Sequence, residues 1–203
     1  MTILSRNDQN GRSMIEMLGV LAIIGVLSVG GISGYSRAMA KYKLTKAQDQ
    51  ITMLLMNIRT AYATSPSYNG LTAQTAADYA IAPGDMIVTT GSGDTATKSL
   101  AGAFGGAVEV NSLGANNAYF YITMRALAQE SCRSLLTSDW GADGLVMIKA
   151  GLDSGYTAPT NADIPCASNA TGGVFCTADL PVDLASAATL CTSPGTFITW
   201  YYY

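Results

Sequence analysis

The feature that most constrains this chain is a long apolar stretch near its start. From Met14 to Tyr35 the only charged side chain is Glu16, and the rest is rich in Leu, Ile, Val, Met and Gly. About 20 consecutive apolar residues are enough for a helix to cross a bilayer. The stretch therefore predicts a membrane-spanning helix. Its glutamate requires a separate explanation, because an ionised side chain in the hydrocarbon costs roughly 2.5 to 3.5 kcal/mol on insertion scales.

The helical pattern continues beyond the apolar stretch. Between Leu44 and Tyr62 apolar residues recur at intervals of three and four, which indicates one buried face of an amphipathic helix. A Ser-Pro pair and an Asn-Gly pair follow soon afterwards and are typical stop signals. We therefore expect one helix that ends near Ala63, with a membrane-spanning half over 12–35 and an amphipathic half over 36–65.

Composition restricts the class of function. The chain has 203 residues, 49% of them hydrophobic, which leaves room for one membrane helix and one globular domain. The net charge of −3 provides no broad basic surface for nucleic-acid phosphates. Histidine is absent, so the commonest general base and the commonest transition-metal ligand are both missing. We expect no nucleic-acid partner, no metal or other cofactor and no enzymatic activity.

The region 66–203 predicts an α+β head with an antiparallel sheet. Short helices are expected within 71–80, after a threonine cap, and within 129–141. The expected strands are rich in β-branched and aromatic residues and are separated by Gly or Asn clusters, and they cover 85–90, 107–111, 118–124, 145–149 and 197–202. Residues 200–203, a Trp followed by three Tyr, predict either an adhesive patch or an edge strand packed on a neighbouring subunit.

The cysteines indicate where the head is found. Their number is even and no C-x-x-C occurs, which favours two disulfides over a zinc or redox site and indicates export from the cytoplasm. The pairing stays open from spacing alone, and buried free thiols are the alternative. The four positions are Cys132, Cys166, Cys176 and Cys191. We interpret the aspartates at 139, 143 and 153 as turn residues rather than calcium ligands, because they lack the spacing of an EF-hand.

The residues before the apolar stretch carry a resemblance to a known family. The segment MTILSRNDQNG is polar and ends at Gly11, and Glu16 is the fifth residue beyond that glycine. This coincidence of glycine, glutamate spacing and apolar run resembles the type IV pilins and their pseudopilin relatives. The resemblance implies a leader peptide, 1–11, that a prepilin peptidase removes between Gly11 and Arg12. It also implies N-methylation of Arg12, although most members of the family have Phe or another large apolar residue there.

The same resemblance gives the helix its partners. It implies that Glu16 meets the N-terminal amine of a neighbouring subunit and sets the register of a helical filament. Arg12 would add positive charge beside that amine, so intramolecular, intermolecular and shared pairing of Glu16 all stay open. The apolar half is also rich in glycine, and the Gly30-x-x-x-Gly34 spacing permits close helix approach. Pilins often have a proline in this half, and none occurs here before Pro66. We therefore predict that Gly30 and Gly31 form the point where the helix softens during assembly.

Two blocks in the head resemble the type IVb pilins in particular. They are SCRSLLTSDWG, which begins at Ser131, and LCTSPG, which begins at Leu190 and precedes the last strand. This resemblance implies disulfides between Cys132 and Cys191 and between Cys166 and Cys176. The region 132–191 would then be bounded by a disulfide. The leader is shorter than in most type IVb pilins.

Other interpretations of the same helix are a minor pilin, a type II secretion pseudopilin, or the anchor of a periplasmic enzyme or binding domain. A secretory signal cleaved after residues 38–40, Ala-Met-Ala, is disfavoured because its apolar core would exceed the usual length of about 7 to 15 residues. The basic residues at 37, 41, 43 and 46 would favour a cytoplasmic location by the positive-inside rule, whereas the cysteines favour export.

The sequence therefore predicts a structural pilin. We expect a precursor in the bacterial inner membrane that the pilus assembly machinery polymerises with copies of itself into an extracellular fibre. Adhesion to cells, conjugation, motility and DNA uptake are all compatible with such a fibre.

Overall fold

The computed structural model describes residues 13–93, 96–141, 143–164, 166 and 172–203. The predicted cleavage site at Gly11 and Arg12 lies outside these residues. The chain divides into two compact units, Met1–Tyr42 and Lys43–Tyr203.

Helix α1 (Ser13–Ala61) forms the described part of the first unit and continues into the second. It ends close to the predicted Ala63. The helix runs without interruption through Gly30 and Gly31.

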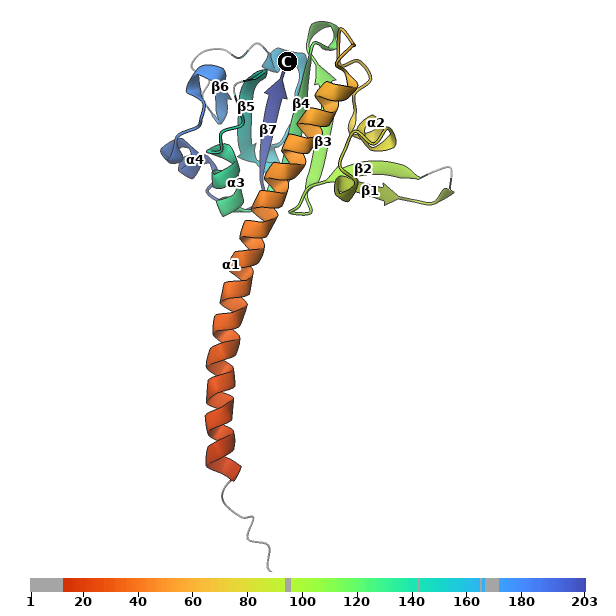
Figure 1. The fold of residues 1–203 in the computed structure, drawn as a ribbon. Coiled ribbons are helices and arrows are strands. Elements are labelled where there is room, and N and C mark those ends of the chain that lie inside the picture. Colours follow the sequence, from red (N-terminus) through yellow and green to blue (C-terminus); the bar gives the residue numbers. More distant parts are fainter. Residues whose placement is uncertain (1–12, 94–95, 142, 165, 167–171) are drawn as a thin grey trace, which may run out of the picture. The chain divides into compact units, whose positions relative to one another are not determined.

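The second unit contains a seven-stranded sheet in the order β1-β2-β3-β4-β7-β5-β6 (Figure 1). Each pair of neighbouring strands is antiparallel. The strands are β1 (Ile87–Thr90), β2 (Thr97–Ala101), β3 (Ala107–Leu113), β4 (Tyr119–Leu127), β5 (Leu145–Leu152), β6 (Val174–Cys176) and β7 (Thr196–Tyr202). The predicted α+β class with an antiparallel sheet is confirmed, whereas β2 and β6 were not predicted.

Short helices connect the strands. They are α2 (Ala73–Asp78), α3 (Gln129–Leu136) and α4 (Leu184–Leu190), with 3-10 turns at Gly84–Met86, Ala115–Asn117, Asp153–Gly155, Asn161–Asp163 and Thr177–Asp179. Helix α2 begins at the predicted threonine cap, where the Thr72 hydroxyl accepts a hydrogen bond from the backbone N–H of Thr75. Helix α4 was not predicted, and the Asp183 carboxylate caps it by accepting from the backbone N–H of Ser186.

The main core lies between the sheet and the second half of α1, which crosses one face of the sheet in Figure 1. Ala47, Ile51, Leu54 and Ile58 are fully buried, as the three-and-four spacing predicts. They belong to one cluster with the sheet residues Phe120, Ile122, Trp200 and Tyr202. Burial of each such Leu or Ile contributes about 1.5 to 3 kcal/mol relative to exposure.

A smaller core covers the opposite face of the sheet. Its buried residues are Leu113, Tyr121, Met147 and Tyr201, and Ile164 and Cys166 pack against them. The sheet is therefore covered on both faces at β7. Both predictions for residues 200–203 are wrong, because β7 is paired with β4 and β5 and its Trp200, Tyr201 and Tyr202 are fully buried.

Candidate functional site

The first half of α1 presents a continuous apolar surface. Every large apolar side chain from Met14 to Tyr35 is at least 51% exposed. Among the described residues, α1 is the one helix long and apolar enough to cross a membrane, and its most apolar window has a mean hydropathy of 2.2. Because water opposes exposure of so much apolar surface, this segment requires lipid or other apolar chains around it.

Glu16 lies in the first turn of this helix. A negative charge is favourable there, because the backbone N–H groups at a helix start carry partial positive charge. The structure thus places the carboxylate at the beginning of the apolar surface and not in its middle, so Glu16 marks one end of the span.

The glycines of this half are not needed for packing within the chain. A Cβ atom built at Gly19, Gly25, Gly30, Gly31 or Gly34 would meet nothing within 4 Å. Small residues on an apolar helix are typical of close approach by another helix. The space beside these glycines is therefore available to a neighbouring chain.

An exposed methionine pair lies on the part of α1 that belongs to the second unit. Met53 and Met56 lie on α1 opposite the buried stripe and are 54% and 65% exposed. Methionine side chains adapt to irregular partner surfaces. The sequence did not lead us to predict a role for this pair. Two methionines three residues apart and outside the buried stripe were the pattern that could have indicated it.

Polar contacts fix the second half of α1 in its unit. Gln50 is almost fully buried, donates to the Asp85 carboxylate at 2.8 Å and accepts from the Ala103 N–H at 3.0 Å. Lys46 pairs with the same Asp85 carboxylate at 3.0 Å. Partial burial raises the pKa of Asp85, but the hydrogen bonds and charge of Lys46 and Gln50 outweigh it and hold that pKa below its usual range. The helix therefore has a defined rotation about its axis, with Met53 and Met56 outward.

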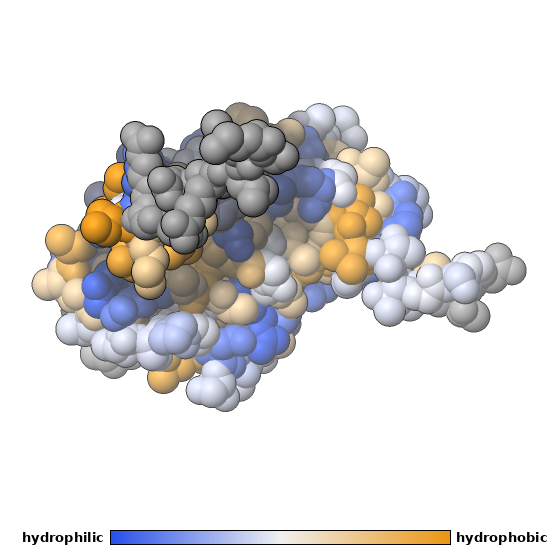
Figure 2. Space-filling view, turned by 90° about the horizontal axis from the view of Figure 1, so that it is seen from below, coloured by the Kyte–Doolittle hydropathy of each residue, from blue (hydrophilic) through white to orange (hydrophobic). Residues whose placement is uncertain are grey.

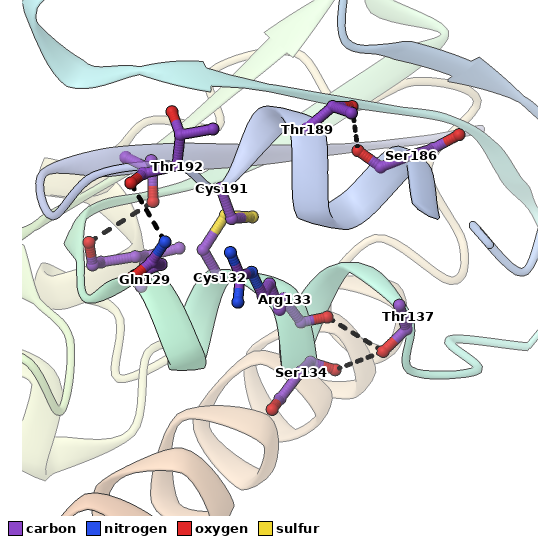
Figure 3. The surroundings of a disulfide bond; sticks show 11 residues. Gln129, Cys132, Arg133, Ser134, Thr137, Ser186, Thr189, Cys191 and Thr192 are labelled. Carbon is purple, nitrogen blue, oxygen red and sulfur yellow. Dashed lines mark hydrogen bonds between the residues drawn. A yellow bond between two sulfur atoms is a disulfide. The ribbon is translucent and has the colours of Figure 1, made fainter. Parts of the chain in front are cut away.

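A disulfide joins α3 to the segment before the last strand (Figure 3). Cys132 and Cys191 are buried, with Cα atoms 5.8 Å apart and a sequence separation of 59. Nearby, the Gln129 side-chain amide donates to the Thr192 carbonyl at 3.0 Å, as Figure 3 shows. This is one of the two pairs that the type IVb resemblance implies, and it closes a loop that begins at α3 and ends just before the last strand.

The second disulfide links Cys166 to Cys176, with a sequence separation of 10. It is the other pair that the resemblance implies. Close by, Lys149 pairs with the Asp163 carboxylate at 3.0 Å, and the same carboxylate accepts from the Thr160 N–H at 2.7 Å. These contacts hold the residues around 160–164 against the smaller core.

A compact ionic cluster lies where the segment after β5 meets β3 and β4. Arg125 pairs with Asp153 at 2.7 Å and with Glu109 at 3.4 Å, and its guanidinium lies 4.5 Å from the centre of the Tyr156 ring. The Tyr156 hydroxyl donates to Glu109 at 2.6 Å. Burial and this hydrogen bond raise the pKa of Tyr156, so the phenol stays neutral. Each group has a partner, which indicates a structural role.

The three aspartates interpreted as turn residues each contact a different partner. Asp139 accepts a hydrogen bond from the Gly141 N–H at 2.9 Å, Asp143 pairs with Arg59, and Asp153 belongs to the cluster around Arg125. Across the described residues no group of three or more His, Cys, Asp or Glu side chains has an arrangement able to hold a metal ion.

Comparison with known proteins identifies the family. The family model described as PilS N-terminal matches residues 41–200, well over half of the chain. Toxin coregulated pilin of Vibrio cholerae serotype O1 (strain ATCC 39315 / El Tor Inaba N16961) is 27% identical over 146 residues. The chain belongs to the type IV pilin family. The resemblance found in the sequence is thereby confirmed at the level of the family.

The match covers 72% of this pilin and 65% of the cholera protein, so the chain spans just under two thirds of that relative's length. The major structural subunit of bundle-forming pilus of Escherichia coli O127:H6 (strain E2348/69 / EPEC) is also 27% identical, over 68% of this pilin and 69% of the relative. The crystal structure of TcpA, a type IV pilin from the Vibrio cholerae El Tor biotype, superposes with a TM-score of 0.56 at 18% identity. That superposition covers 80% of this pilin and 99% of TcpA, and it shows the shared fold.

Proposed function

We propose that this pilin is the structural subunit of a type IVb-like pilus and polymerises through α1. The observation that carries the proposal is the exposed apolar surface of α1 from Met14 to Tyr35. No other described helix is apolar and long enough to be its partner within the chain. Copies of the same helix are therefore its natural partners once it leaves the membrane.

The glutamate supplies the register of the fibre. A carboxylate transferred into an apolar filament core is costly unless a positive charge compensates for it. The N-terminal amine of a neighbouring subunit provides such a charge, and Glu16 lies in the first turn of α1, close to where that amine would be. A pairing that is favourable in one axial position alone would fix how far successive subunits are displaced.

The proposed life cycle begins with a precursor in the bacterial inner membrane. Prepilin peptidase removes 1–11, the new N-terminal Arg12 is methylated, and the assembly machinery extracts the subunit into an extracellular pilus. The two disulfides support an oxidising environment for the head. The names of the relatives, one a major structural subunit of a pilus, support a structural and not a catalytic role.

The variant Glu16→Ala tests the register argument. We expect normal amounts in the membrane fraction and at least a tenfold loss of pilin from the sheared surface fraction, measured by immunoblot. The matched control is Ser33→Ala, on the same helix segment, which should leave both fractions unchanged. Fibres of normal yield from Glu16→Ala would contradict the role given to this carboxylate.

Mass spectrometry of the mature N-terminus tests the processing step. A methylated chain that begins at Arg12 is the expected result. An intact Met1 would indicate a simple anchor, and a start at Lys41 would indicate a secreted domain. The share of this pilin in sheared fibres separates a major subunit, which dominates that material, from a minor pilin or pseudopilin.

A further inference from the structure

Strand β1 leaves one edge of the sheet open. It pairs with β2 over all four of its residues, from Ile87 opposite Leu100 to Thr90 opposite Thr97, and within the described residues no other strand pairs with it. In an antiparallel pair, alternate residues direct their backbone N–H and C=O groups away from the partner strand. Such an edge is a template for pairing with another chain.

Stretches of β2 and β3 that do not pair with each other are contacted by other described segments of the head. On β3, Asn111 bridges to Thr72, and the Ser112 N–H donates to the Leu71 carbonyl at 3.2 Å. On β2, the Lys98 N–H donates to the side chain of Gln74 on α2 at 3.0 Å. At the opposite end of the sheet, β6 has only three residues and ends in a disulfide-bonded cysteine. Among the described strands, β1 thus combines an edge position with a full-length pairing surface that no described segment contacts, whereas the other edge strand, β6, is short.

The surface around this edge lacks the devices that prevent strand pairing. We call residues 87–93 and 96–101 the arm; it extends from the sheet beside α2 in Figure 1. Strand β1 reads Ile-Val-Thr-Thr, which is entirely β-branched and uncharged, and Val88 is 43% exposed. Edge strands in monomeric proteins are usually protected by a charge, a proline or a bulge. On the face that Figure 2 shows, the arm is mostly pale, neither strongly hydrophilic nor strongly hydrophobic.

Two of the described charges near the arm are neutralised within the chain. Lys98 pairs with Asp78 at 3.1 Å, and Asp85, just before β1, pairs with Lys46 at 3.0 Å. Two identical arms can therefore approach without repulsion between uncompensated charges of β1 or β2. A strand that pairs antiparallel with its own copy places residues of β1 opposite other residues of β1, so a charge on β1 would meet a like charge nearby. The absence of charge from β1 therefore favours a second copy over a charged partner.

We propose that β1 pairs antiparallel with β1 of a second copy about a two-fold axis, and that this contact joins neighbouring filaments. The proposal rests on the filament function proposed above. A two-fold contact uses the same surface on both subunits and is complete after two copies, whereas a filament grows through contacts between different surfaces. Pairing of β1 with β1 therefore cannot propagate a fibre, but it can link subunits of two fibres side by side.

Cysteine cross-linking tests the contact itself. Val88→Cys and Thr89→Cys are made separately in the full chain, and the pilin is oxidised in detergent with copper phenanthroline. We expect at least five times more disulfide-linked dimer on a non-reducing gel than from Leu184→Cys, which places a thiol at a position that is 69% exposed on α4. Dimer yields equal to that control for both variants would overturn the pairing.

A charge at the edge tests the link between fibres. Val88→Lys should leave the amount of sheared fibre unchanged but lower the share that pellets at low speed at least threefold, with single fibres in electron micrographs. Leu184→Lys, with the same change of charge, should leave both unchanged. A loss of fibre from Val88→Lys, unchanged bundling, or native fibres that never associate would overturn the proposal. If the native chain forms no fibre at all, the filament function fails, while the cross-linking result still decides whether β1 pairs with β1.

Discussion

At the scale of single residues, Gly106 occupies a position that no larger side chain fits. It follows the turn between β2 and β3, and its carbonyl accepts from the Gly102 N–H at 2.9 Å. A Cβ atom built there would clash with the backbone carbonyl of Arg125 in β4 and would lie 2.8 Å from the Cβ of Ala126. The turn can approach β4 so closely because residue 106 has no side chain.

Gly106→Ala should therefore lower the free energy of unfolding by about 1 to 3 kcal/mol, the usual range for overpacking. Chemical unfolding of the full chain in detergent, followed by near-ultraviolet circular dichroism, measures the change. Gly84→Ala is the matched control, since a Cβ atom there would meet nothing within 4 Å. Equal stability of the two variants would show that the β2–β3 turn can move away from β4.

Asp163 gives the head a dependence on pH. Partial burial raises its pKa, but the Thr160 N–H and the Lys149 ammonium outweigh burial and hold the pKa below its usual value. A carboxyl whose pKa is lower in the folded state stabilises the fold above its unfolded pKa of about 4, and this contribution is lost as pH falls through the folded value. The ionised form is thus the stabilising one.

Asp163→Asn should lower the free energy of unfolding by about 1 to 2 kcal/mol at neutral pH, as expected for hydrogen bonds to a charged group. The difference from the native chain should shrink as the pH is lowered from 5 to below 3, in a series of denaturant titrations. Asp179→Asn, at an exposed position, serves as the control and should show little difference at any pH. A difference for Asp163→Asn that stays constant with pH would contradict the assigned protonation.

At the scale of elements, the two disulfides close loops of very different length. The sequence separation is 59 for Cys132–Cys191 and 10 for Cys166–Cys176. The chain-entropy treatment gives about 4 kcal/mol for the longer loop and about 3 kcal/mol for the shorter one. The longer loop is closed by two buried residues, Cys132 and Cys191, whereas Cys166, which closes the shorter loop, is only half-buried.

Replacing Cys132 and Cys191 by alanine should therefore lower the melting temperature more than replacing Cys166 and Cys176. Thermal unfolding of both double variants, at one detergent and protein concentration, measures this order. The shorter pair is the internal control, because each variant loses one disulfide and two sulfurs. The reverse order would indicate that the segment closed by Cys166 and Cys176 contributes more to the fold than the connection of α3 to β7.

The elements that were predicted are those with a strong local pattern. The buried stripe of α1 and the threonine cap of α2 depend on neighbouring residues alone, and both are found. Strand β2 reads Thr-Lys-Ser-Leu-Ala and has one fully buried apolar side chain, Leu100. Its position depends on contacts that are distant in sequence, such as the Gln74 side chain that accepts from its backbone. The residues next to β2 in the sequence do not include Gln74, so a local pattern could not predict this strand.

At the scale of the whole molecule, the order of the strands in the sheet could not be predicted from local sequence patterns. A strand was correctly predicted over 197–202, within β7, but an edge position was considered where the structure has an interior strand of the sheet. An unbroken aromatic run is a sign of burial on both faces, and Trp200 and Tyr201 do lie in different cores. The family, by contrast, could be identified because its signature is concentrated around Glu16 and the apolar stretch after it.

Gly30 and Gly31 are expected to affect the isolated subunit and the fibre differently. The helix is continuous through Gly30 and Gly31, and a Cβ atom at either position would meet nothing within 4 Å. Alanine is favoured over glycine in a helix by about 1 kcal/mol per residue. The double variant Gly30→Ala/Gly31→Ala should therefore leave the helix of the isolated subunit intact or stabilise it.

If the pair is the point where α1 softens during assembly, the same variant should lower fibre yield several-fold with unchanged pilin in the membrane. Gly19→Ala/Gly25→Ala is the matched control, because it replaces two glycines of the same helix that also have open space around them. The measurements are far-ultraviolet circular dichroism of the subunit and immunoblots of sheared and membrane fractions. An equal loss of fibres from the two double variants would assign the glycines to close helix packing in place of softening. Undiminished yield from Gly30→Ala/Gly31→Ala, or a filament map with continuous helix through both glycines, would contradict the softening.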